Sequence, residues 1–312
     1  MDRRDFLKAA AAAGLGLAFA GDMAGAPGIR NRRAAAGEAP ARPDAPADIV
    51  AVRNGEPEAM FDLGIAAMGG IGRFVKPGQT VTLKVNVSWD VRPELAGNTH
   101  PGLVDRVVRR CLEAGASRVY VVDHNIENGQ RCYQTSGIGD AARSAGAMIA
   151  PAEAERYYQS VPVAGKILTG AKVHETILGA DVLVSLPVLK HHGGAGMSGS
   201  LKNFMGAVWD RRYYHRNNLQ QCIADFFAVR KPDLNIVDAY RVITQNGPRG
   251  GSAADVAVMK MQILSTDIVA ADAAGARLFG RSPDSFGHVK IAHEMGFGEI
   301  DPSRLVARRI TA

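Results

Sequence analysis

The sequence has 312 residues, 46% of them hydrophobic and 22% charged, which is ordinary for a globular protein of one large or two smaller domains. The net charge of +6 comes with no lysine-rich run and only 6% aromatic residues, which argues against a nucleic-acid-binding protein. The three cysteines, Cys111, Cys132 and Cys222, form no C-x-x-C pair. They predict neither a disulfide framework nor an iron–sulfur cluster, and we interpret them as small buried hydrophobic residues.

The first twenty residues have the features of an export signal. Arg3 and Arg4 precede Phe6-Leu7-Lys8, a mild apolar run at 9–20 follows, and Ala18-Phe19-Ala20 forms a small-residue cleavage site. This pattern resembles a twin-arginine signal, which implies the twin-arginine translocase as a partner and a periplasmic or extracellular location. No later stretch reaches the length of an apolar membrane span, so we expect none in the mature protein.

Strands alternate with helices through the rest of the chain. Residues 21–47 are rich in Ala, Pro, Gly and Arg and predict a disordered linker, whereas 48–312 predict a single α/β domain of a catalytic type. Residues 210–215 are interpreted as a polar connector. Near-continuous apolar strands indicate a mainly parallel sheet flanked by helices. We expect strands at 49–52, 80–87, 118–123, 147–150, 181–189, 234–238, 258–264 and 304–310, and helices at 57–71, 101–114, 138–146, 203–209, 219–229, 267–279 and 282–294.

Polar side chains stand at the ends of three expected strands. Because parallel strands end at one edge of a sheet, and ligands bind beyond that edge, these residues predict a single active site. Among them we expect Lys84, Asn86, Lys190 and His191 to bind the substrate, and Lys84 and Lys190, with Arg211 from a later segment, to hold its carboxylate. The three ends carry Lys84 and Asn86, then Asp123 and His124, then Lys190, His191 and His192.

A loop with four glycines follows the third strand end, and Lys202 follows the loop. Backbone N–H groups in such a loop are free to meet an anion or a flat cofactor. Lys202 is either a nucleophilic or anion-binding amine, or a structural lysine paired with an acid. A cation at a helix start opposes the helix dipole, which favours the functional interpretation. A phosphate loop of the Walker type is excluded because Ser200 stands where lysine is required.

Five segments of the chain, taken in their order and spacing, are similar to the uncharacterised family called domain of unknown function 362. Some members of that family carry a ferredoxin-like cluster segment, and this chain lacks its cysteines, so no iron–sulfur cluster is expected. The similar segments are Lys84-Val85-Asn86-Val87, Thr99-His100-Pro101, the run from Leu186 to His192, the run from Ser198 to Asn203, and the run from Asp267 to Asp272.

A further resemblance is to the N-terminal domain of the nickel-pincer lactate racemases, in which a histidine, a Ser-Gly loop and a lysine follow one another. The resemblance implies a lactate-racemase-like fold, with Lys202 as the attachment point of a nickel-pincer-like or other metal cofactor. Gly196, Ser198 and Gly199 would contact that cofactor. It also implies that His192 and His124 transfer protons on opposite faces of the substrate. His215 would be the metal ligand, although it lies closer to Lys202 in sequence than in the racemases.

The histidines each have an alternative interpretation. His191 either orients His192 or is itself the active residue, and imidazole suits proton transfer in both directions near neutral pH. His124 is either a proton-transfer residue or a capping or turn residue. The arginines beside His215 disfavour a second cation there and fit carboxylate binding better. Asp267 and Asp272 are interpreted as helix caps without a catalytic role.

These observations predict an exported cofactor- or metal-dependent enzyme, an isomerase or oxidoreductase acting on a small hydroxy or oxo acid. Two alternatives stay open. One is a non-catalytic periplasmic protein that binds a small anionic ligand in the same basic pocket. The other is a redox accessory protein that works with a separate iron–sulfur partner.

Overall fold

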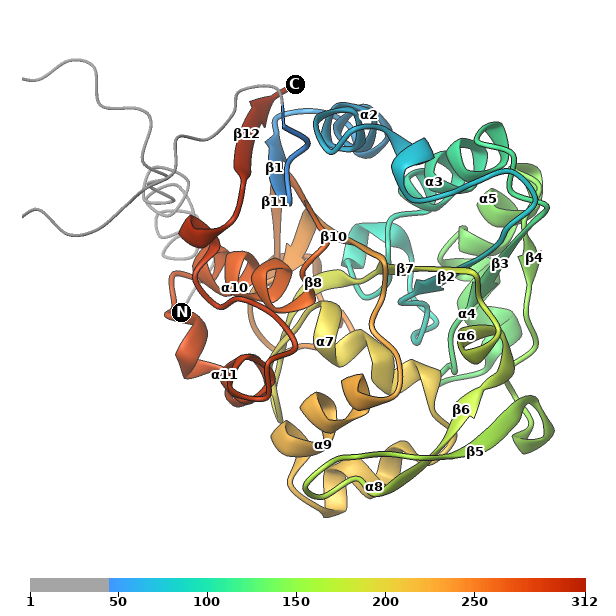
Figure 1. The fold of residues 1–312 in the computed structure, drawn as a ribbon, viewed down its shortest axis with the longest axis vertical. Coiled ribbons are helices and arrows are strands. Elements are labelled where there is room, and N and C mark those ends of the chain that lie inside the picture. Colours follow the sequence, from blue (N-terminus) through green and yellow to red (C-terminus); the bar gives the residue numbers. More distant parts are fainter. Residues whose placement is uncertain (1–44) are drawn as a thin grey trace, which may run out of the picture.

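A ten-stranded sheet forms the centre of the computed structural model, which describes residues 45–312 (Figure 1). The predicted signal and nearly all of the predicted linker lie outside the described residues. Eight strands follow one another across the sheet, and those from β10 to β4 are parallel. In spatial order they are β12 (Ala307–Thr311), β1 (Ile49–Arg53), β11 (Val256–Ser265), β10 (Leu234–Ile243), β7 (Val182–Leu186), β2 (Thr80–Val85), β3 (Arg118–Val122) and β4 (Met148–Ile149).

Two further strands extend the sheet beside β10. The strand β8 (Val188–His192) continues β7 beyond Pro187 and runs parallel to the later part of β10. The short strand β9 (Gly196–Ser198) returns antiparallel to β8, so the glycines lie in and beside a tight hairpin. β11 is antiparallel to both of its neighbours, which makes the sheet mixed rather than purely parallel.

Helices cover both faces of the sheet (Figure 1). One apolar cluster joins the sheet to α2 (Pro57–Ala67), α3 (Pro101–Glu113), α4 (Gly129–Thr135) and α5 (Ile138–Ser144). The other joins it to α6 (Glu175–Leu178), α7 (Ser200–Asn203), α8 (Arg211–Arg216), α9 (Leu219–Asp225), α10 (Ile268–Leu278) and α11 (Gly287–Glu294). A separate antiparallel hairpin, β5 (Tyr158–Pro162) and β6 (Gly170–His174), lies beside the second group.

The alternation along β2 determines which way its lysine points. Val81, Leu83 and Val85 belong to the cluster of α2 and α3. Successive side chains of a strand point to opposite faces, so Thr82 and Lys84 point to the face covered by α7. An amine is thereby placed inside the fold at the end of β2, where Lys84 is fully buried.

The structure confirms the predicted mainly parallel α/β architecture and differs from it in several local details. The predicted connector at 210–215 is wrong, because residues 211–215 belong to α8, whose first turn is capped by Asp210 accepting from the Tyr213 N–H at 3.2 Å. The helix expected at 203–209 begins earlier, at Ser200, and continues as a 3₁₀ helix from Phe204. The β5–β6 hairpin, α4 and β9 were not expected, because short elements carry little periodicity.

The cysteine prediction is confirmed, since all three cysteines are free and buried. Within residues 45–312, no helix combines the length and apolar character that crossing a bilayer requires.

Candidate functional site

A cavity of about 330 Å³ opens beyond the ends of β2 and β3, between β8, α7 and α8. Its lining includes four cationic side chains, Lys190, Lys202, Arg211 and Arg212, and a single acid, Asp123. Such a strongly basic lining attracts anions, and the charge of that one acid determines how much net positive charge the cavity keeps.

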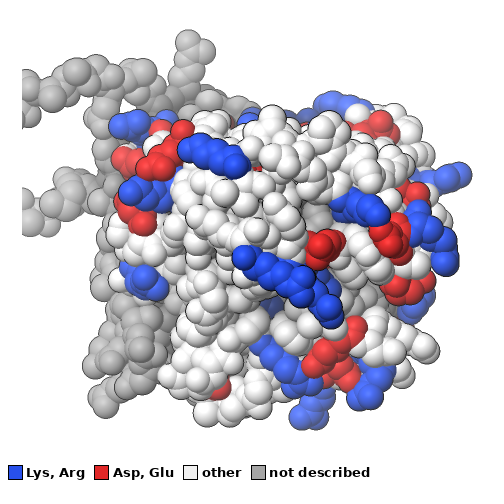
Figure 2. Space-filling view, turned by 90° about the horizontal axis from the view of Figure 1, so that it is seen from below, with Lys and Arg blue, Asp and Glu red and all other residues white. Residues whose placement is uncertain are grey.

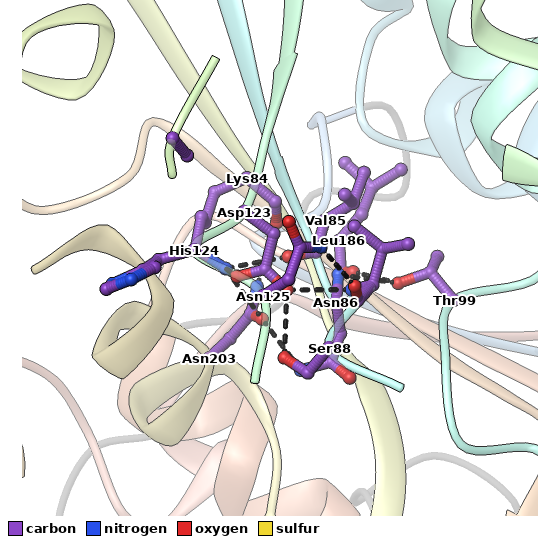
Figure 3. A network of polar contacts seen from close by, with 12 residues as sticks. Lys84, Val85, Asn86, Ser88, Thr99, Asp123, His124, Asn125, Leu186 and Asn203 are labelled. Carbon is purple, nitrogen blue, oxygen red and sulfur yellow. Dashed lines mark hydrogen bonds and ion pairs between the residues drawn. The ribbon is translucent and has the colours of Figure 1, made fainter. Parts of the chain in front are cut away.

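The charge of this acid is neutralised by Lys84 (Figure 3). The Lys84 amine donates to Asp123 Oδ1 at 2.8 Å, to the Val85 carbonyl at 2.7 Å and to Asn203 Oδ1 at 3.2 Å. An ammonium group has three N–H donors, and each of these has an acceptor. Burial lowers the pKa of Lys84, and the charge of Asp123 acts in the opposite direction.

The second carboxylate oxygen of Asp123 is also occupied. It accepts from the Val87 N–H at 2.8 Å and from the Ser88 hydroxyl at 3.0 Å. Gly206 packs directly against this pair, and a Cβ atom there would lie 1.9 Å from Asp123 Oδ1. The floor of the cavity is therefore a closed, neutral network that only a glycine can cover.

Asn203 ties this floor to the adjoining wall. Its amide Nδ2 donates to the Lys84 carbonyl at 2.8 Å, and its Oδ1 accepts from Asn86 Nδ2 at 3.4 Å. Asn203 thus links the end of β2 to α7, two segments that are far apart in sequence. Its neighbour Lys202 is carried into the cavity wall by the same attachment.

Lys190 reaches the cavity because of the alternation along β8. Val188, Lys190 and His192 line the cavity, while Leu189 belongs to the apolar core on the other side. The Lys190 amine donates to Asn86 Oδ1 at 2.9 Å and to the Gly97 carbonyl at 2.5 Å. Burial, and then the nearby charge of Lys202, lower the pKa of Lys190 to about 7.

Lys202 differs from both other lysines, because its amine makes no hydrogen bond or ion pair with any residue in 45–312. Burial and the charge of Arg211 lower its pKa to about 8. The turn that carries it is held by the buried Asp272, whose carboxylate accepts from the Ser200 and Leu201 N–H groups at 2.5 and 3.0 Å. Since α7 is only four residues long, a helix dipole gives no support to a functional role of Lys202. That role is supported instead by the absence of a partner for the amine within residues 45–312.

The backbone around His192 determines which of its ring nitrogens carries the proton. Nδ1 accepts from the N–H groups of Gly194 and Ala195, both at 3.1 Å. Burial, and then the charges of Lys202 and Lys190, lower the pKa of His192 to about 3. The ring is therefore neutral with its hydrogen on Nε2, which makes it a donor to a bound ligand rather than a proton acceptor.

The α8 side chains complete the mouth of the cavity. Arg211 donates to the carbonyls of His124 and Asn125 at 2.6 and 2.7 Å, which fixes its guanidinium group. Arg212 and His215 are exposed and line the cavity. Burial, and then the charges of Lys202 and Arg211, lower the pKa of His215. Within the described chain, no three side chains of His, Cys, Asp or Glu gather in a way that could hold a metal ion.

Several predicted site residues lie elsewhere. The ring of His124 points away from the Lys84–Asp123 pair (Figure 3) and stacks on Trp209 at 5.0 Å between centroids. It lines a neighbouring cavity of about 1010 Å³, so the structure does not bring His124 and His192 together. His191 accepts from the Gly247 N–H at 3.2 Å on the opposite side of β8.

The remaining predicted residues are divided between the cavity and its surroundings. Asn86, Ser198 and Gly199 line the cavity. Gly196 instead packs against Phe286, and Lys84 lies under the floor rather than in contact with a ligand. Asp267 caps α10 as expected, with its Oδ1 accepting from the Val269 N–H at 2.8 Å. Asp272 does not cap α10 but reaches across to α7, which corrects the sequence interpretation.

Sequence reasoning gave no role in the site to Asn203 and placed Arg212 only at a carboxylate-binding surface. The signal for Asn203 was its position directly after Lys202. On the face of the molecule seen in Figure 2, basic and acidic side chains are interspersed.

Three known proteins are similar to the chain over part of its length. A thylakoid-associated protein of Synechocystis sp. is 25% identical over 213 residues, which cover 66% of this chain and 64% of that protein, less than two thirds of its length. The lactate racemase apoprotein of Thermoanaerobacterium thermosaccharolyticum is similar with a TM-score of 0.43 and 11% identity, over 78% of this chain and 56% of that chain. A structural genomics target from Thermotoga maritima has a TM-score of 0.46 and 12% identity, over 77% and 60% of the two chains.

The family model described as a domain of unknown function, number 362, matches residues 81–277. That segment is more than half of the chain and includes the floor, the walls and the mouth of the cavity. The chain therefore belongs to the family of domain of unknown function 362.

Proposed function

We propose that the cavity is the active site of an exported enzyme that acts on a small hydroxy or oxo acid. One observation carries the proposal: four cationic side chains line a small cavity whose single acid is already neutralised by Lys84. The remaining positive charge calls for an anionic ligand, and a carboxylate of a small acid suits the volume of about 330 Å³.

The side chains around the cavity support distinct roles. Lys190 has two acceptors in the protein, which leaves its third N–H for a carboxylate oxygen. His192 would donate its Nε2–H to a hydroxyl or carbonyl oxygen of the ligand. Lys202 would be the reactive amine, because it has no partner among the described residues and its pKa of about 8 lies near physiological pH.

A cofactor that brings its own metal ligands is compatible with the side chains present. Lys202 and His215 line the same cavity, so the amine would attach the cofactor instead of acting on the substrate itself, and the imidazole would complete its metal coordination. Such a group would supply an electron-accepting centre that the side chains themselves lack. A bare metal ion does not fit, because no cluster of three suitable side chains exists in the described part of the chain.

The position of His124 favours a second candidate, a non-catalytic protein that binds a small anion. Two-sided proton transfer needs a base on each face of the substrate, and the ring of His124 lines the neighbouring cavity instead. A binding protein needs only the basic pocket. Both candidates predict that the cavity binds small acids, and only the first predicts that the bound acid is converted to a product.

The export proposal is supported by Arg3 and Arg4 and the apolar run that follows them. Replacing both arginines with lysine in the full-length chain should keep the protein in the cytoplasm. Fractionation of cells that express the two versions tests this directly.

The proposed activity is tested by titrating the protein with lactate, pyruvate and malonate in a calorimeter, with acetamide as an uncharged control. Proton exchange and isomerisation of the same acids are followed in deuterated water by nuclear magnetic resonance. We expect binding of the acids, weaker binding in Lys202→Met, and turnover of at least one hydroxy or oxo acid by protein from the native host. Binding without any turnover would favour the second candidate, and no binding would overturn both.

A further inference from the structure

We propose that Lys202 bonds covalently to its substrate, forming an imine with the carbonyl carbon of a bound oxo acid. The inference rests on the proposed function and names the substrate class more narrowly: the ligand carries both a carboxylate and a ketone or aldehyde group.

The first argument is the difference in partners among the three lysines of this region. Lys84 donates to three acceptors and Lys190 to two, so both amines are committed to the protein. The Lys202 amine has no hydrogen bond or ion pair within residues 45–312. A polar group that is half-buried and lines a cavity without a partner is available to a ligand.

The second argument is that the backbone under Lys202 is rigidly held. Its neighbours Leu201 and Asn203 are buried, and Asp272 accepts from the N–H groups at the start of the turn. Gly199 permits this contact, because a Cβ there would lie 2.3 Å from Asp272 Oδ1. A reactive group fixed in this way has little freedom to lose when it attacks a bound molecule.

The third argument is electrostatic. The charged or titratable groups that line the cavity with Lys202 are Lys190, His192, Arg211, Arg212 and His215, while Asp123 is paired with Lys84. Positive neighbours and burial disfavour the ammonium form, and neutral amines attack carbonyl groups. The same cations would hold the carboxylate of the substrate beside the amine.

The bonding change is balanced without a further reactant. The nitrogen lone pair of the neutral Lys202 amine attacks the carbonyl carbon, forming a C–N bond while the C=O electron pair moves to oxygen. Both hydrogens of the amine are transferred to that oxygen in turn, and it leaves as water. The product is an imine between Lys202 and the former carbonyl carbon, and no electrons are gained or lost. His192 would steady the oxygen by donating its Nε2–H.

Borohydride trapping tests the inference. The full-length protein is incubated with pyruvate and reduced with sodium borohydride, and the modified residue is located by peptide mass spectrometry. We expect a reduced pyruvate adduct at Lys202 that is lost in Lys202→Arg and kept in Lys231→Arg, which alters an exposed lysine outside the cavity. Circular dichroism verifies that both variants are folded.

Malonate separates the two possible failures, because it carries carboxylates but no ketone or aldehyde. If malonate binds and competes with pyruvate while no adduct forms at Lys202, the imine inference is overturned and the proposed function stands. If an adduct forms equally on surface lysines and persists in Lys202→Arg, the inference is likewise overturned. If neither acid binds, the proposed function fails together with the inference.

Discussion

The floor and the wall of the cavity use the same residue type in opposite ways. On the floor, Lys84 is fully buried and its three donors are satisfied by Asp123, Asn203 and a backbone carbonyl. In the wall, Lys202 is half-buried and has no partner among the described residues. The difference shows that a buried charge is structural where the protein supplies its acceptors, and available for binding where it does not.

The largest expected effect is a loss of stability when the Lys84–Asp123 ion pair of the floor is removed. Lys84→Met leaves Asp123 charged and buried without its cation, which should cost about 3–5 kcal/mol of unfolding free energy. Denaturant unfolding measures this loss. The double variant Lys84→Met with Asp123→Asn is the control, and it should recover part of the stability because no unpaired charge remains. A cost below about 1 kcal/mol for the single variant would show that the pair is not structural.

The next effect is on the pH dependence of stability, through Asp272, which holds the turn that carries Lys202. Burial raises the pKa of Asp272 to about 7, above its ordinary value of 3.8. The folded protein then binds this proton more tightly than the unfolded chain, so stability is greatest below pH 4 and falls as pH rises towards 7. Asp272→Asn removes this titration and keeps one of the two acceptor oxygens, because its amide oxygen accepts from one of the Ser200 and Leu201 N–H groups while its amide nitrogen faces the other. The difference in unfolding free energy between the two proteins should change by up to about 4 kcal/mol across that range. A constant difference would contradict the raised pKa.

A third prediction separates binding from stability in the wall. Lys202→Met should weaken malonate binding by about 1.5–3 kcal/mol, or roughly tenfold to a hundredfold, and change the unfolding free energy by less than about 1 kcal/mol. The pKa of Lys202 is about 8 and that of Lys190 about 7, so the wild type should lose affinity as pH rises through this range. The variant should lose only the part due to Lys190. Calorimetry at several pH values measures both effects, and unchanged affinity would exclude Lys202 from the ligand contact.

The smallest effect lies at the mouth. Arg212 is exposed, so Arg212→Ala should weaken malonate binding by less than about 1 kcal/mol and reduce its salt dependence. Arg211→Ala is the comparison, because that guanidinium fixes two backbone carbonyls and its loss should also lower stability. Equal effects of the two variants on stability would contradict the distinction.

The fold was predictable because alternating strands and helices leave few topologies, and the carboxyl ends of β7, β2 and β3 necessarily share an edge. The placement of Lys190 follows from the two-residue period of its strand. The structural role of Lys84 and the free amine of Lys202 were not predictable from the sequence. The difference depends on acceptors of Lys84, such as Asn203 and Asp123, that lie far from it in sequence. His124 could not be oriented either, since it follows the end of β3, where the strand period no longer applies.

The neutral floor under a basic wall has a practical consequence for work with the purified protein. Since Lys84 already cancels the one acid among the described residues of the lining, no uncompensated negative side chain of residues 45–312 repels a small anion there. Phosphate, sulfate and citrate from buffers should occupy the site and mask weak ligands. Exchange into a zwitterionic buffer of low total anion concentration, followed by reintroduction of one anion at a time, is therefore the starting condition for any search for the natural ligand.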